Sequence, residues 1–248
     1  EEKRKSGNWK LVFLSKHYDV FSNGDGEEVK ALAARMDLVC EEFRKIFGYR
    51  GELTRPFPIC LYASQGEFMR ATQMPDGVGG YYDGDKIVGF HGTMYGLTTD
   101  TVLVHEGTHQ FQGLVFGENL WRASLWFIEG LAVYFESSKV EGKHLITDVI
   151  PRERLLTVKR ALQTGTSIRL ADLIRTEQAR FDAYHYAHAW SLIYFLVHGT
   201  RGGLDRLKKY FEGVKQGKDG VKLFEELFDK PIDAIEEAWK DFVLRITR

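Results

Sequence analysis

The sequence predicts an α+β fold with a small mixed sheet and helices in its first half, and helices alone in its second half. Up to about residue 116, short apolar runs typical of strands alternate with segments of helical periodicity. From about residue 120 onwards, nearly every apolar pattern has helical spacing, with Gly and Pro between segments. The 248 residues therefore suit a single domain, with an N-terminal α/β lobe at about 9–116 and a C-terminal helical lobe at about 120–248.

The composition of the chain argues against some classes of binding partner. The formal net charge of −1 argues against nucleic acid or an anionic membrane as the main partner, because both usually demand a basic face. No apolar run approaches the ~18 residues that span a bilayer, so we expect no membrane span. The chain begins at Glu1 without a Met, which suggests a processed or trimmed protein. The sequence does not specify an oligomeric state.

The N-terminal lobe is expected to contain strands, two helices and a hairpin. The expected elements are strands at 9–15 and 18–21, a helix at 27–47, a strand at 57–62, a short helix to about residue 72, and a β-hairpin built from 81–82 and 86–91. Gly48 is placed to end the first helix, and Ser64 with Glu67 predicts a capping box at the start of the second.

The chain contains two cysteines, Cys40 and Cys60. Cys40 falls on the apolar face of the first expected helix, and Cys60 falls in an expected strand. We interpret both as buried free thiols that behave as small hydrophobic side chains, with a disulfide as the alternative. Neither lies in a Cys-x-x-Cys pattern, so a cysteine-based metal site is not expected.

The rest of the chain is expected to be helical apart from a short hairpin at 139–147 around Gly142. The expected helices cover 98–113, 123–137, 152–164 with a continuation over 168–174, 181–198, 203–213, 221–228 and 231–246. The basic helix at 152–164 is interpreted as a solvated face rather than a binding patch.

The helix expected at 98–113 carries the sequence His105-Glu106-Gly107-Thr108-His109. Residues four apart lie one turn apart on the same helix face, so both imidazoles point to one side, with Glu106 beside them. A catalytic zinc uses three protein ligands and keeps a fourth position for water. The motif therefore predicts a metal site in which Glu106 takes a proton from that water.

A third ligand is suggested by Glu129, which lies in the apolar run Trp126–Ala132. A carboxylate in such a run is costly to bury unless a cation pairs with it, and a metal would supply that cation. The alternative, a surface glutamate, would expose a helix whose other residues are those of a buried one.

The spacing excludes the metzincin pattern, because Gln112 and Val115 stand where that pattern has Gly and His. The chain instead resembles the gluzincins, and most closely a largely uncharacterised bacterial group of peptidase-like proteins. The signatures His-Glu-x-Thr-His-Gln and Trp-x-x-Glu-Gly-Leu-Ala-x-Tyr-Phe-Glu of that group read here as 105–110 and 126–136. The resemblance implies a zincin-like fold from about 18 to 242, one Zn²⁺ held by His105, His109 and Glu129, and Glu106 as the general base.

The same resemblance suggests residues that contact the substrate. Gluzincins commonly supply an oxyanion donor from a helix after the third ligand, and a Tyr-Ala-x-Ala-Trp stretch falls here on 186–190. Tyr186 is the first candidate, and His185 and Tyr184 follow; the alternative is that these aromatics pack the helix start. The strand of Ile87, Val88, Gly89 and Phe90 is expected at the active-site edge, where an extended peptide can add as another strand; the alternative is an ordinary hairpin over the core.

Ligating histidines usually donate their second N–H to a carboxylate or carbonyl. Many gluzincins place an Asp four residues after the third ligand, but that position is Val133 here. Glu136 is the expected substitute in the second shell, and a helix-end surface charge is the alternative. We expect His188 to be a core or surface histidine rather than a ligand, and His91 to lie outside the site.

These observations predict a zinc-dependent peptidase that acts on a peptide or protein substrate. Two alternatives stay open: an inactive zincin-fold module that binds metal, and a zinc hydrolase of a non-peptide amide or ester. An extracytoplasmic or secreted location is expected, since many members of such groups are exported, with the cytoplasm as the alternative. The sequence does not reveal cleavage preference or the choice between endo- and exopeptidase action.

Overall fold

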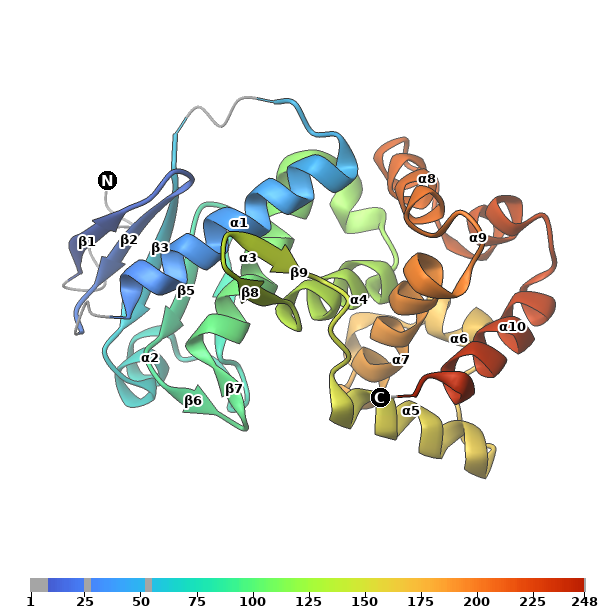
Figure 1. Ribbon diagram of the computed structural model, residues 1–248. Coiled ribbons are helices and arrows are strands. Elements are labelled where there is room, and N and C mark those ends of the chain that lie inside the picture. The colour runs from blue at the N-terminus through green and yellow to red at the C-terminus, as the bar shows by residue number, and fades with distance from the viewer. Residues whose placement is uncertain (1–8, 25–27, 52–54, 248) are drawn as a thin grey trace. The chain divides into compact units, whose positions relative to one another are not determined.

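A computed structural model describes residues 9–24, 28–51 and 55–247 (Figure 1). It confirms the predicted α+β class. The chain divides into two compact units, residues 1–111 with 139–146 and residues 112–138 with 147–248. In the described part of the chain, no helix has both the length and the apolar character needed to cross a membrane.

The first unit is built on a five-stranded mixed sheet with the order β1-β2-β3-β5-β4. Its strands are β1 (Lys10–Leu14), β2 (Tyr18–Ser22), β3 (Phe57–Tyr62), β4 (Gly80–Tyr82) and β5 (Ile87–Phe90). The inner pairs β2–β3 and β3–β5 are parallel, whereas the outer pairs β1–β2 and β4–β5 are antiparallel. The β1–β2 ladder contains a register shift between Leu11 and Phe13.

The position of β5 corrects one prediction. Ile87, Val88, Gly89 and Phe90 were expected on the sheet edge, but β5 pairs with β3 on one side and with β4 on the other. All four residues are buried. The prediction was wrong because the hairpin partner β4 covers one edge of β5, while a non-local strand, β3, takes the other. A peptide therefore cannot add to β5.

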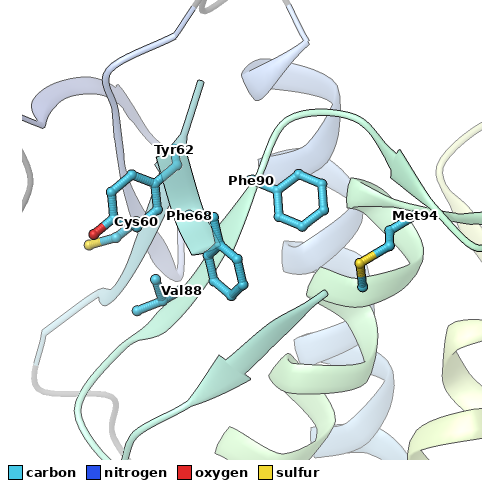
Figure 2. Packing of buried hydrophobic residues seen from close by; sticks show 6 residues of the cluster. All are labelled: Cys60, Tyr62, Phe68, Val88, Phe90 and Met94. Carbon is cyan, nitrogen blue, oxygen red and sulfur yellow. The ribbon is translucent and has the colours of Figure 1, made fainter. Parts of the chain in front are cut away.

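Helix α2 (Gln65–Thr72) packs on one face of the sheet. Phe68 of this helix lies among side chains that alternate along β3 and β5 (Figure 2), and the cluster contains Cys60, Tyr62, Phe68, Val88, Phe90 and Met94. Only half of the predicted capping box forms. The Ser64 hydroxyl accepts a hydrogen bond from the Glu67 N–H, but the Glu67 carboxylate accepts one from the Asn23 amide instead of bonding back to Ser64.

Helices α1 (Val29–Phe47) and α3 (Thr99–Phe116) pack against each other in this unit. A Cβ on Gly107 of α3 would lie 2.4 Å from the Met36 methyl group of α1, so a larger residue at this position would require the Met36 side chain to shift. Gly48 ends α1 in the left-handed conformation, as predicted. Cys40 and Cys60 are free and buried, also as predicted. Two short hairpins complete the unit: β6 (Thr93–Met94) with β7 (Leu97–Thr98), and β8 (Lys139–Glu141) with β9 (His144–Ile146).

The second unit is helical, as predicted. Its helices are α4 (Leu125–Glu136), α5 (Arg152–Thr164), α6 (Leu170–Arg175), α7 (Ala183–Tyr194), α8 (Gly203–Lys215), α9 (Gly220–Phe228) and α10 (Ile232–Arg245). A 3₁₀ segment follows α3 at Gly117–Arg122, and a π-helical segment follows α7 at Phe195–Gly199. Helix α4 is buried from Trp126 to Glu136, which is expected of a helix that is apolar all round.

Two helices and one hairpin depart from the prediction in ways that the structure explains. Helix α3 continues past Gly113 to Phe116, because the Phe116 ring packs on Phe211 with a centroid distance of 4.6 Å. Helix α6 is separate from α5, because Gly165 ends α5 in the left-handed conformation. The hairpin at 139–146 groups with the first unit, although its sequence falls within the range expected for the C-terminal lobe.

Candidate metal centre

Helix α3 contacts helix α1 at two places, one at the start of α3 and one about three turns further along. At its start, the Thr98 hydroxyl accepts a hydrogen bond from the Thr101 N–H, and Asp100 forms an ion pair with Arg35 of α1. Further along, the Phe111 ring stacks on Phe43 of α1 at a centroid distance of 4.7 Å. These contacts hold the segment that carries the two motif histidines.

His105 and His109 lie on one face of α3, as their spacing predicts. Their ring centroids are 4.7 Å apart, and the rings meet edge to face at 83°. Both side chains are half-buried. Two imidazoles one turn apart can therefore direct a nitrogen each toward the same point.

Glu129 is positioned by two contacts of helix α4. The Gln112 side-chain amide, at the last turn of α3, donates a hydrogen bond of 3.0 Å to the carbonyl of Ile128, the residue before Glu129. On the other side, Gly130 packs directly against the Ala189 carbonyl of α7. Glu129 itself is only 8% exposed, which confirms the prediction that this side chain is buried and not on the surface.

The ligand atoms of His105, His109 and Glu129 all lie within 4.8 Å of one another. Among the residues that the structure describes, this is the one group of at least three His, Cys, Asp or Glu side chains that could hold a metal ion. These are the three residues that the sequence predicted as metal ligands. Two imidazole nitrogens and one carboxylate oxygen form a donor set suited to a divalent transition metal.

Glu106 lies next to His105 in α3 and is half-buried. Within residues 9–24, 28–51 and 55–247, we find no hydrogen bond or ion pair to its carboxylate. A carboxylate beside the cluster that is not engaged elsewhere can accept a proton. Its role as the base stays a prediction.

Glu136 is buried at the end of α4, so the alternative of a surface charge is wrong. Its carboxylate forms an ion pair of 2.7 Å with Arg154 of α5. The same guanidinium lies 5.9 Å from the ring centroid of Tyr186 in α7. Glu136 is thus tied to the candidate oxyanion donor through Arg154, and its orienting role toward a ligating histidine stays a prediction.

Arg154 was not recognised from the sequence, because it falls in a basic helix interpreted as solvated. Its side chain is 24% exposed and is engaged on both sides. Helical periodicity identifies the apolar face of α5, but no local signal identifies Glu136 as the partner of Arg154. The role of Gln112 in positioning Glu129 was also not predicted. The sequence had indicated Gln112 only as a residue that excludes the metzincin pattern.

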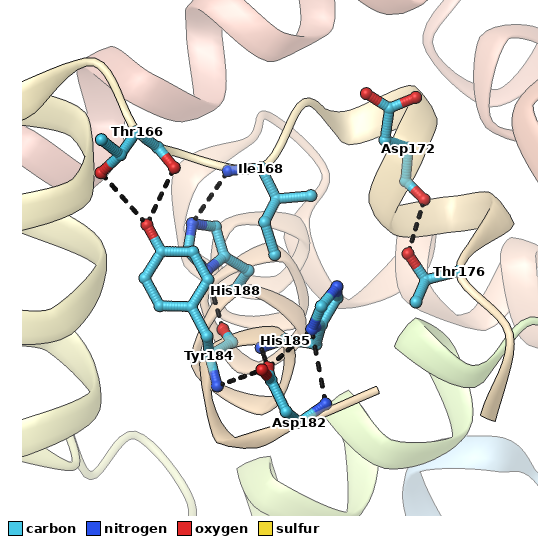
Figure 3. A network of polar contacts seen from close by, with 8 residues as sticks. All are labelled: Thr166, Ile168, Asp172, Thr176, Asp182, Tyr184, His185 and His188. Atoms are coloured by element: carbon cyan, nitrogen blue, oxygen red, sulfur yellow. Dashed lines mark hydrogen bonds and ion pairs between the residues drawn. The ribbon is translucent and has the colours of Figure 1, made fainter. Parts of the chain in front are cut away.

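The N-terminus of α7 engages two of the candidates in local contacts (Figure 3). The Asp182 carboxylate accepts hydrogen bonds from the N–H groups of Tyr184 and His185, and it lies 2.7 Å from His185 Nδ1. The hydrogen bond from His185 lowers the pKa of Asp182. The Tyr184 hydroxyl donates to the Thr166 carbonyl at 2.9 Å. The observed contacts of Tyr184 and His185 therefore agree with the alternative in which these aromatic side chains pack the start of the helix.

His188 is a core histidine, which is one of the two placements that the sequence left open. Its Nδ1–H donates to the Tyr184 carbonyl at 2.8 Å, and its Nε2 accepts from the Ile168 N–H at 3.3 Å (Figure 3). One ring nitrogen donates and the other accepts, so the ring is neutral. Burial lowers the pKa of His188 to about 4. His91 lies elsewhere, with its Nε2 3.0 Å from the Ser22 hydroxyl.

Comparison with models of protein families gives a match to a family without an assigned function. The model of a family described as "Protein of unknown function (DUF1570)" matches residues 99–212, a little under half of the chain. The matched range runs from the start of α3 into α8, and it contains all three residues of the cluster that could hold a metal ion. No curated protein matches the sequence.

Proposed function

We propose that this protein is a zinc-dependent peptidase. The observation that carries the proposal is the cluster of His105, His109 and Glu129 with the Glu106 carboxylate beside it. Two histidines and a glutamate form the three-ligand set of catalytic zinc sites such as those of thermolysin-type enzymes. A structural zinc site would need a fourth protein ligand, and within the described residues the cluster has three members.

The residues fit a zinc ion. Tetrahedral zinc with donors at about 2.0–2.2 Å separates those donors by roughly 3.3–3.6 Å. The three ligand atoms lie within 4.8 Å of one another, so small rotations of the side chains are sufficient to close the set on a metal. The low exposure of Glu129 supports the fit, because a bound cation offsets the cost of burying its charge.

When bound, zinc lowers the pKa of a water molecule and polarises the carbonyl of the scissile bond. Glu106 accepts a proton from the attacking water as the water oxygen bonds to the carbonyl carbon. It then passes that proton to the amine nitrogen as the carbon–nitrogen bond breaks, so one water is consumed and a carboxylate and an amine are released. Glu106 therefore returns to its starting state.

We assign the oxyanion donor to Tyr186. Helices α4 and α7 touch where Gly130 meets the Ala189 carbonyl. Gly130 follows Glu129 directly, and Tyr186 precedes Ala189 by three residues, which is about one turn on the same helix face. This packing supports placing the Tyr186 hydroxyl near the third ligand, where a hydrogen bond would stabilise the developing negative charge.

The test is hydrolysis of a panel of unfolded proteins and peptides by the zinc-loaded protein and by Glu106→Gln. We expect peptide cleavage by the wild type and a loss of about two orders of magnitude or more in the variant, with zinc retained. Glu118→Gln, at an exposed position outside the cluster, is the matched control and should keep full activity.

The same experiment separates the alternatives. Undiminished hydrolysis by Glu106→Gln would reject the proposed mechanism. Bound zinc without cleavage of any peptide, amide or ester would favour the metal-binding module, and cleavage confined to non-peptide amides or esters would favour the third alternative.

A further inference from the structure

The second unit contains a pocket of about 320 Å³ whose lining includes none of the metal-cluster residues. It is formed by the π-helical segment, the turn into α8, and parts of α9 and α10. Its charged lining residues are Arg201, Arg206, Lys230, Arg245 and Asp241. Phe195 and Phe228 supply an aromatic wall. A volume of this size is at the small end of the range for ligand pockets.

The charge of the lining is unbalanced. Four cationic side chains share the pocket with one carboxylate, Asp241. None of the four forms an ion pair with another residue in the part of the chain that the structure describes. The protein as a whole carries a net charge of −1, so this concentration of positive charge is local. Like charges gathered around a concave surface attract an anion.

One of the cations is held in a defined orientation. The Arg206 guanidinium lies 4.2 Å from the centroid of the Phe228 ring. Phe228 in turn stacks on Phe195, with planes only 6° apart and centroids 6.0 Å apart. Stacking on an aromatic face fixes the guanidinium plane and leaves its N–H edge available for a ligand.

The turn that carries Arg201 is also packed tightly. A Cβ on Gly199 would lie 2.5 Å from the Phe195 ring and 2.8 Å from the Phe242 ring. The Thr200 hydroxyl donates a hydrogen bond to the Leu196 carbonyl. Gly199 closes the π-helical segment, and π-helical turns are rare and often occur at functional sites. The turn therefore holds the backbone of Arg201 beside the aromatic wall.

We propose that this pocket binds a small phosphate-bearing molecule. A phosphate dianion offsets more of the excess positive charge than a single carboxylate does, and arginine forks match phosphate oxygens with paired hydrogen bonds. The aromatic wall provides a surface for a small organic group attached to the phosphate. The pocket does not depend on the proposed peptidase activity, and either proposal can fail alone.

The test is calorimetric titration of the full-length protein with inorganic phosphate, glycerol 3-phosphate and acetate at matched ionic strength. Arg206→Gln removes the stacked cation, and Arg201→Gln removes an exposed cation that forms no ion pair with any residue that the structure describes. Lys222→Gln, at an exposed position of α9 outside the pocket, is the matched control.

We expect saturable binding of phosphate by the wild type and by Lys222→Gln. Binding should be about tenfold weaker or worse in each arginine variant, as for the loss of one charge-assisted hydrogen bond. Tighter binding of glycerol 3-phosphate would identify an ester as the ligand, and tighter binding of inorganic phosphate would identify the free ion. Three results would overturn the proposal: no saturable binding, equal affinity for acetate, or equal weakening in Lys222→Gln.

Discussion

Gly130 of helix α4 lies directly against Ala189 of helix α7, so closely that a Cβ at residue 130 would approach the Ala189 carbonyl oxygen to 2.7 Å. The two helices can meet at this distance only because residue 130 has no side chain. The residue before Gly130 is the buried ligand candidate Glu129. The contact thus links the packing of the helical unit to the position of the metal cluster.

Gly130→Ala should therefore destabilise the protein. The added methyl group meets a backbone carbonyl, which cannot rotate away, so we expect a loss of about 1–3 kcal/mol in the free energy of unfolding. Urea denaturation measures this change. Gly66→Ala is the matched control: Gly66 is in helix α2, and its added Cβ would meet only the flexible end of Arg70. That control should be neutral or slightly stabilising, and equal stability of both variants would contradict the packing argument.

Glu129→Gln should reduce metal binding. The change keeps the shape of the side chain but removes the negative charge that completes the donor set of His105, His109 and Glu129. Metal content by mass spectrometry should fall from about one zinc per wild-type chain to a small fraction. Glu106→Gln, beside the cluster, should keep its zinc. If the wild type takes up no zinc even after reconstitution, the metal centre and the peptidase proposal both fail.

Tyr186→Phe should lower kcat with little change in KM. Removal of one oxyanion donor costs about 10²–10³-fold in kcat, and zinc content should not change. Tyr184→Phe is the control, because the Tyr184 hydroxyl donates to the Thr166 carbonyl; it should keep its activity. Full activity in Tyr186→Phe would show that the aromatic ring serves in packing instead.

Arg154→Met should destabilise the protein, because it removes the cationic partner of the buried Glu136 carboxylate. We expect a loss on the order of 2–4 kcal/mol, somewhat below that for a wholly buried pair, since Arg154 is partly exposed. The double variant Glu136→Gln/Arg154→Met should recover much of this loss. A double-mutant cycle by chemical denaturation measures the coupling, and a coupling near zero would show that the ion pair contributes nothing.

Stability should fall as the pH drops from about 6.5 toward 4. Burial lowers the pKa of His188 to about 4, whereas an unfolded histidine titrates near 6.5. Between these values the unfolded chain binds a proton that the folded protein does not, so the stability present above pH 6.5 is lost progressively, by up to about 3 kcal/mol.

The measurement is urea denaturation of metal-free protein across this range, compared with His188→Gln. The variant should lack this part of the pH dependence, while groups common to both proteins cancel in the difference. Parallel pH profiles would mean that His188 is protonated in the folded state as readily as in the unfolded chain.

Local signals in the sequence predicted many element boundaries and the three residues that could hold a metal ion. Strand 57–62 and helix 152–164 have the predicted bounds, because apolar periodicity and nearby turn residues define them. The cluster of His105, His109 and Glu129 was predictable because helix geometry places the two histidines, and because a glutamate in an apolar run is unusual.

Long-range contacts explain what was missed. Gly113 looked like a helix end, but packing of Phe116 against Phe211 extends α3 beyond it. The hairpin of β4 and β5 was recognised, but nothing near Ile87 indicates that β3 takes the other edge of β5. The pairing of Glu136 with Arg154 joins residues 18 positions apart on two different helices. The periodicity of a single helix therefore could not predict it.

In the described part of the chain, strand β1 lies at one of the two edges of the five-stranded sheet, and it presents Leu11 and Leu14 at 51% and 62% exposure. A flat apolar strand in this position would be a template for pairing with another copy of the chain. The register shift between Leu11 and Phe13 interrupts the regular ladder, and a bulge of this kind bends and twists the strand that contains it. The irregular ladder therefore makes β1 a poorer template for pairing with another chain than a flat, regular strand with the same apolar side chains would be.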